Sequence, residues 1–170
     1  MRKTVIVLLA ILWSQAVATT VLAEAPVQTG VGALTIELPA TPPGSAVTIT
    51  AQGKARVRLA GYMRLMICVN GRACGQGVAF WGGGPREMAA KASCAFKLGA
   101  TPDKVVIRAK SCSARLPDAP NALTSRVVPG ADLKQLGLAF RGNMSCAQVI
   151  QAAEKFCCEF KKRYKNPNGC

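Results

Sequence analysis

The sequence predicts an α+β protein with a small antiparallel β-sheet, a middle helix and a C-terminal amphipathic helix, stabilised by disulfides. Short segments rich in β-forming residues alternate with turn residues in the first half of the chain. An apolar stripe with helical spacing runs near the C-terminus. Eight cysteines occur in 170 residues, and an even number in an exported chain is typical of disulfides rather than of a metal site.

The N-terminus has the three-part layout of a secretory signal peptide. Two basic residues precede an unbroken apolar run over residues 5–13, and small residues frame a cleavage site before Glu24. We therefore expect residues 1–23 to be removed, with a cut after Ala18 as the alternative. The mature protein would then be secreted or periplasmic. No later stretch of the sequence is apolar and long enough to cross a membrane.

The mature chain is long enough for one domain with its own hydrophobic core. We expect residues 24–45 to form an extended N-terminal segment and residues 46–170 to form a single disulfide-linked α+β domain. Short strands are predicted over 31–38 and 46–50, because both segments are rich in β-forming residues and a Thr-Pro-Pro-Gly break separates them.

The clearest strand prediction covers residues 54–59, where three basic residues alternate with three apolar ones. A half-buried strand with this pattern has one cationic face and one apolar face. A further strand over 62–69 is followed by an Asn-Gly dipeptide at 70–71, which is typical of tight hairpin turns. The two segments therefore predict part of an antiparallel sheet.

A middle helix is predicted over residues 85–98. Three glycines at 82–84 interrupt the chain before it, and Pro85 suits the first helical position because its missing N–H would be unpaired there anyway. Gly99 would end this helix. A strand over residues 104–110 and a proline-containing loop then follow.

The last helix is the best-defined element of the sequence. Ser145 and Gln148 have the spacing of a capping box. Basic residues crowd the predicted last turn, where positive charge is favoured by the helix dipole. The apolar residues that recur with helical spacing are Cys146, Val149, Ile150, Ala153, Phe156, Cys157 and Phe160.

Helix geometry limits how the cysteines can pair. Cys146 and Cys157 are separated by roughly 16 Å along the helix axis, which is too far for a disulfide between them. We expect both to bond to the earlier cysteines, and Cys158 to bond to Cys170. Two local bridges are also conceivable, Cys68–Cys74 across the hairpin turn and Cys94–Cys112 between the middle helix and the next strand, but both cannot coexist with two long-range bridges. The earlier cysteines are Cys68, Cys74, Cys94 and Cys112.

The sequence contains no histidine, which excludes Ser-His-Asp and Cys-His catalysis and imidazole metal ligands. The carboxylates occupy predicted loops, first turns and exposed helix faces, where ordinary structural roles explain them. No catalytic residue, metal site or cofactor is predicted, and a non-enzymatic protein is favoured over an enzyme. The alternative is a small secreted effector or toxin, for which hydrolysis by carboxylates is one option.

The net charge of +14 favours an anionic partner. The expected function is binding to an anionic polymer or membrane surface, or interaction with an envelope protein as a component of the cell envelope or of a secreted assembly. The other interpretation of the charge is a solvated basic surface that keeps the protein soluble. The chain has few aromatic rings on which nucleic-acid bases could stack, namely two Trp, two Tyr and five Phe. This scarcity argues against a nucleic acid as the partner. The candidate anion-binding residues are Lys54, Arg56, Arg58, Arg64, Lys161, Lys162, Arg163 and Lys165.

Overall fold

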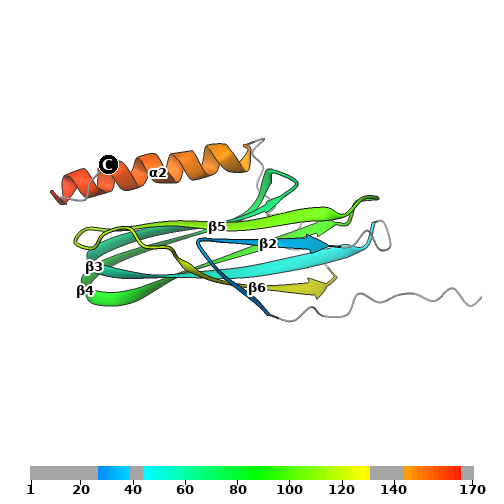
Figure 1. The fold of residues 1–170 in the computed structure, drawn as a ribbon, viewed down its shortest axis with the longest axis horizontal. Helices are drawn as coiled ribbons and strands as arrows, with labels where there is room; N and C mark the ends of the chain where they lie inside the picture. The colour runs from blue at the N-terminus through cyan, green and yellow to red at the C-terminus, as the bar shows by residue number, and fades with distance from the viewer. Residues whose placement is uncertain (1–26, 39–43, 131–143, 166–170) are drawn as a thin grey trace, which may run out of the picture.

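An antiparallel β-sheet forms most of the protein (Figure 1). The structure is a computed structural model that describes residues 27–38, 44–130 and 144–165, so the predicted signal peptide and Cys170 lie outside the described residues. Within these ranges, six strands belong to one sheet and one helix lies against it. The elements are β1 (Gln28–Val31), β2 (Ala33–Leu38), β3 (Ala46–Val69), β4 (Arg72–Lys97), β5 (Asp103–Ser113), β6 (Ala122–Pro129) and α2 (Cys146–Arg163). The predicted balanced α+β class is therefore wrong, because strands dominate.

The sheet curls into a nearly closed, barrel-like structure because β3 pairs with different strands along its length. Residues 47–54 of β3 pair with β6, whereas residues 61–69 pair with β5. β2 pairs with β5, β1 pairs with β6, and β1 and β2 follow each other directly. β4 accompanies β3 over almost its whole length. The β3–β4 hairpin thus contributes to both walls of the barrel-like structure, the one that contains β6 and the one that contains β5.

The long hairpin bends near Leu59. The pairing register of β3 and β4 shifts between Val57 and Leu59, and the φ angle of Leu59 is 72°. Leu59 is paired with Gly83, whose φ angle of 141° lies in a region that glycine adopts readily because it lacks a Cβ. The three glycines at 82–84 therefore lie at a strand bend and not before a helix.

The hydrophobic core lies between the two walls. Ile49 and Leu65 come from opposite halves of β3, and both are fully buried. They pack with Ile107 of β5 and Leu123 of β6 in one cluster. Because successive side chains of a strand point to opposite faces, the residues next to these in sequence point outward.

The predicted middle helix over residues 85–98 is wrong, because residues 85–97 form the second half of β4. Met88, Ala90 and Ala92 are buried, whereas Ala89 and Lys91 between them are exposed, which is the period of a strand. The first half of β3 pairs with the segment residue by residue. Tertiary pairing thus overrides the helix propensity of an alanine-rich sequence.

Several strand predictions are confirmed. The segments 54–59 and 62–69 both lie within β3, although they form one continuous strand. Asn70 and Gly71 have φ angles of 49° and 80°, as expected for a two-residue hairpin turn, and β4 follows directly. The segment 104–110 lies within β5.

The C-terminal helix is also confirmed, as α2. The Ser145 hydroxyl accepts a hydrogen bond from the Gln148 backbone N–H, and the Gln148 side chain accepts one from the Ser145 backbone N–H. α2 packs on the outer face of the sheet, where Val149 contacts Met66 of β3 (Figure 1). No helix among the described residues is long and apolar enough to span a membrane.

Candidate functional site

Disulfides join α2 to the sheet and join the two halves of β4 to each other. Two of the bridges join α2 to the strands, as helix geometry predicts for Cys146 and Cys157, and the third joins the two halves of β4. Neither of the two local pairings weighed from the sequence occurs. Cys158 is disulfide-bonded as well, and its predicted partner lies outside the described residues. The bridges within the described residues are Cys68–Cys146, Cys112–Cys157 and Cys74–Cys94.

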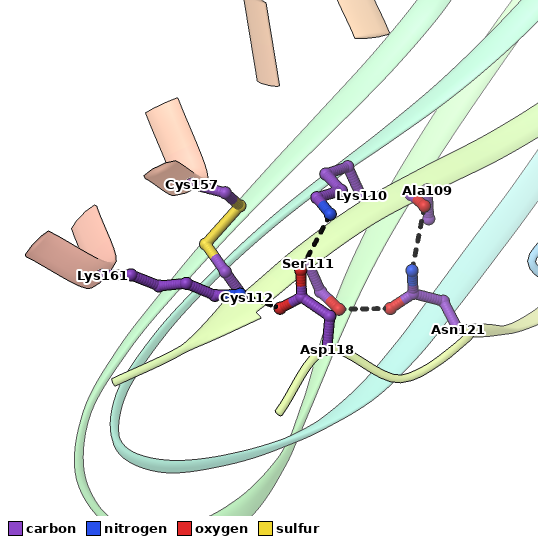
Figure 2. Close-up of a disulfide and its surroundings, with 8 residues drawn as sticks. All are labelled: Ala109, Lys110, Ser111, Cys112, Asp118, Asn121, Cys157 and Lys161. Carbon is purple, nitrogen blue, oxygen red and sulfur yellow. Dashed lines mark hydrogen bonds and ion pairs between the residues drawn. A yellow bond between two sulfur atoms is a disulfide. The ribbon is translucent and has the colours of Figure 1, made fainter. Parts of the chain in front are cut away.

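A lysine–aspartate cluster anchors the second half of α2 beside the Cys112–Cys157 bridge (Figure 2). Asp118 lies in the loop between β5 and β6, and its two carboxylate oxygens lie 2.7 Å from Lys161 Nζ and 2.9 Å from Lys110 Nζ. Burial alone would raise the pKa of Asp118, but hydrogen bonds and charges from both lysines outweigh it and lower the pKa below its ordinary value. Lys161 therefore has a structural role.

The structure divides the predicted anion-binding residues between two surfaces. Lys54 and Arg56 point outward from the half of β3 that pairs with β6, and Arg58 is exposed near the bend. Lys162, Arg163 and Lys165 are exposed at the end of α2, on the other side of the sheet (Figure 1).

Arg64 lies apart from both sets. It is half-buried on the half of β3 that α2 covers, where its Nη2 donates a hydrogen bond of 3.1 Å to Gln76 Oε1. Its Nε is buried and has no hydrogen-bond partner among the described residues. The eight candidate residues therefore do not form one continuous site.

A polar groove of about 550 Å³ lies on the outer face of β4, β3 and β6. Side chains of these strands line the groove together with Val27, which precedes β1. Two basic residues lie on the strands to either side of β3, Lys91 on β4 and Arg126 on β6. Two rows of paired residues cross the strands: Lys91, Gln52 and Thr124 in one, and Ser93, Thr50 and Arg126 in the other. Lys54 and Arg56 continue the same outward-facing line of β3 beyond Gln52.

The β4 side of the groove is held in place by close packing and a disulfide. Gly75 and Gly77 lie against the backbone of Ser93 and Lys91, and a Cβ on either glycine would collide with a carbonyl oxygen there. The Cys74–Cys94 bridge joins the same two segments. The backbone that carries Lys91 and Ser93 is therefore fixed before any ligand binds.

Sequence reasoning missed both basic residues of the groove. Lys91 fell within the predicted middle helix, and no element was assigned to Arg126. In the structure, Leu123, Ser125 and Val127 are buried and alternate with Thr124 and Arg126. The sequence indicates this period only weakly, because Ser125 is polar and Val128 is apolar.

A chain of aromatic rings lies where α2 meets the outer face of β3 and β4. Tyr62 of β3 contacts Phe80 of β4 and Phe156 of α2, with ring centroids 5.2 Å and 4.3 Å away. Phe160 and Tyr164 extend the chain along α2. Burial raises the pKa of Tyr62, although Arg64 partly opposes the shift. Tyr62 is buried, whereas Phe80 is 66% exposed and Phe156 is 40% exposed.

Two other carboxylates, those of Asp103 and Glu87, have structural partners. Asp103 is buried and accepts hydrogen bonds from the Gly99 backbone N–H at 2.8 Å and from the Asn70 side chain at 2.7 Å. Glu87 forms an ion pair of 2.8 Å with Lys54. No cluster of three or more Cys, Asp or Glu side chains among the described residues could hold a metal ion.

Comparison with protein-family models and with curated proteins finds no match. The interpretation of function therefore depends on the chemistry and arrangement of the side chains in the groove and in the aromatic chain.

Proposed function

We propose that this disulfide-rich protein is secreted or periplasmic and binds an acidic polysaccharide in the polar groove. The observation that supports this proposal is the position of Lys91 and Arg126 on the strands to either side of β3, whose hydroxyl and amide side chains line the groove. Disulfides persist in oxidising compartments, where such polymers are exposed on cell surfaces and in secretions.

The spacing of the two basic residues suits an extended ligand. Neighbouring strands lie about 4.8 Å apart, so β4 and β6, which flank β3, lie about 10 Å apart. Lys91 and Arg126 can therefore contact different acidic groups of one polymer that crosses the strands. Lys54 and Arg56 add positive charge along the same face, and the exposed ion pair of Lys54 with Glu87 costs little to open.

The lining favours a polysaccharide over a nucleic acid. Thr50, Gln52 and Thr124 can donate hydrogen bonds to sugar hydroxyls and accept hydrogen bonds from them. The described residues that line the groove include no aromatic side chain, and single-stranded nucleic acids are usually held by bases stacked on aromatic rings. Charge supplies attraction, whereas the hydroxyl and amide groups supply recognition of the sugar.

The test is a binding titration of the oxidised protein with heparin and polygalacturonate as acidic probes and dextran as the neutral probe. The groove variant is Lys91→Gln with Arg126→Gln. The matched control is Lys104→Gln with Arg108→Gln, which removes the same two charges from exposed positions of β5 outside the groove.

We expect an acidic probe to bind, binding to weaken with added salt, and dextran not to bind. Loss of two direct charge contacts should weaken binding by roughly tenfold or more in the groove variant. The control variant should retain most of the affinity. Equal losses in both variants would mean that net charge alone is responsible, and absence of binding to both acidic probes would reject the proposal.

A further inference from the structure

The aromatic chain carries an exposed apolar surface that the proposed polysaccharide groove does not use. We define the aromatic patch as Val78 and Phe80 of β4, Phe156 of α2 and Tyr164 at the C-cap of α2, all of which are exposed. The rings of Phe80 and Phe156 lie 6.2 Å apart, so strand and helix present one surface. Soluble proteins seldom leave several large apolar side chains exposed side by side without a binding function.

The aromatic patch is rigidly supported. Tyr62 lies beneath it and contacts the rings of both Phe80 and Phe156. The Cys112–Cys157 bridge attaches α2 to β5 at the residue that follows Phe156. The patch is therefore preformed, and burying it against a partner would require little ordering of the protein.

Basic side chains surround the helical part of the aromatic patch. Lys155, Lys162 and Arg163 of α2 and Lys165 just after it are all exposed, and the exposed acidic residues of the helix are Glu154 and Glu159. Arg163 follows Phe156 by two helical turns and so lies on the same side of α2. Exposed aromatic side chains beside basic ones complement the interface of an anionic membrane, where rings enter the headgroup region and cations attract the phosphates.

A second copy of the chain fits this surface less well. The net charge of +14 makes two copies repel each other, whereas it attracts an anionic surface. We propose that the aromatic patch binds the headgroup region of an anionic phospholipid membrane. The aromatic patch lies on the side of the sheet that carries α2, whereas β6, which carries Arg126 of the groove, lies on the opposite side (Figure 1). The groove and the patch share no residue, although Gln76 of the groove lies on the same outward-facing line of β4 as Val78 and Phe80. This inference does not depend on the polysaccharide proposal.

The test is co-sedimentation of the oxidised protein with vesicles of phosphatidylcholine alone or mixed in equal amounts with phosphatidylglycerol. Phe80→Ser removes the most exposed ring of the aromatic patch. Val31→Ser is the matched control, because Val31 is an exposed apolar residue at the end of β1, outside the patch. Phe80→Trp retains an aromatic ring and reports its environment by fluorescence.

We expect binding to the mixed vesicles and little binding to phosphatidylcholine alone. Phe80→Ser should weaken vesicle binding by about tenfold, as expected when one aromatic ring no longer enters the interface. Val31→Ser should bind as the wild type does, and the emission of Phe80→Trp should shift to the blue on binding.

Three results would overturn the proposal. The first is no binding to the mixed vesicles, and the second is equal binding by Phe80→Ser and the wild type. The third is a dimer that forms in the absence of lipid and dissociates in Phe80→Ser, since the aromatic patch would then be a contact between two copies. The polysaccharide titration is independent of all three results, because Phe80 does not line the groove.

Discussion

Lys161 Nζ of α2 lies 2.7 Å from Asp118 Oδ1, and the Lys161 side chain is only 7% exposed. The same carboxylate binds Lys110 of β5, so one acidic residue joins the helix, a strand and a loop (Figure 2). Close by, the Ser111 hydroxyl donates a hydrogen bond of 2.6 Å to Asn121, which fixes the other end of the loop. A buried lysine needs such a partner because burial penalises its charged form.

Asp118→Asn should destabilise the fold and change its response to acid. A carboxylate whose pKa is lowered by folding stabilises the folded state above its unfolded pKa, and this contribution is lost as the pH falls through the folded pKa. The wild type should therefore lose more stability than the variant as the pH falls below about 4. At neutral pH the variant should be less stable by about 1–2 kcal/mol. Urea unfolding across this pH range measures both effects.

The control for this change is Glu159→Gln, which removes one negative charge from an exposed position of α2. Its stability should stay within about 0.5 kcal/mol of the wild type at neutral pH. If both variants lose the same stability, the contacts of Asp118 with the two lysines contribute nothing specific.

The Cys74–Cys94 bridge should stabilise the fold and maintain the groove. Cys74→Ser with Cys94→Ser opens a disulfide between residues 20 positions apart, which should cost about 2–4 kcal/mol. Because this bridge joins the two halves of β4, affinity for the acidic probe should fall as well. Cys68→Ser with Cys146→Ser opens a bridge to α2 and should leave that affinity nearly unchanged. Denaturation without reductant and the heparin titration measure the two effects, and equal affinities in both variants would contradict the prediction.

Gly77 should not tolerate a larger side chain. A Cβ at this position would collide with the backbone carbonyl of Lys91, and a backbone group cannot move aside as the end of a flexible side chain can. We expect Gly77→Ala to cost at least about 2 kcal/mol, as overpacking of a core does. Gly82→Ala is the matched control, because nothing lies near the added methyl group there. Thermal unfolding of the two variants should separate them clearly, and similar melting temperatures would refute the close contact.

Local signals predicted the elements whose determinants are close in sequence. The capping box at Ser145 predicted the start of α2, and the Asn-Gly dipeptide predicted the β3–β4 turn. Helix length alone showed that Cys146 and Cys157 must bond elsewhere, as both do. These features depend on a few neighbouring residues or on the dimensions of one helix.

The remaining features depend on contacts between distant segments. Residues 85–97 form a strand because β3 pairs with them, and nothing within the segment reveals that partner. The groove contains Lys91 of β4 and Arg126 of β6. These two residues come together only because β4 and β6 pair with opposite edges of β3. Lys161 belonged to a basic run in the sequence, but its contact with Asp118 makes it structural.

Substitutions at two adjacent alanines test directly that residues 85–97 form a strand. Ala90 is 2% exposed and faces the core, whereas Ala89 beside it is exposed. Ala90→Gln should cost about 2–4 kcal/mol, because it places an amide without hydrogen-bond partners among apolar side chains. Ala89→Gln should change stability by less than about 0.5 kcal/mol, because its side chain points to solvent. Urea unfolding of both variants measures the difference, and equal costs would mean that the two side chains do not point to opposite faces of β4.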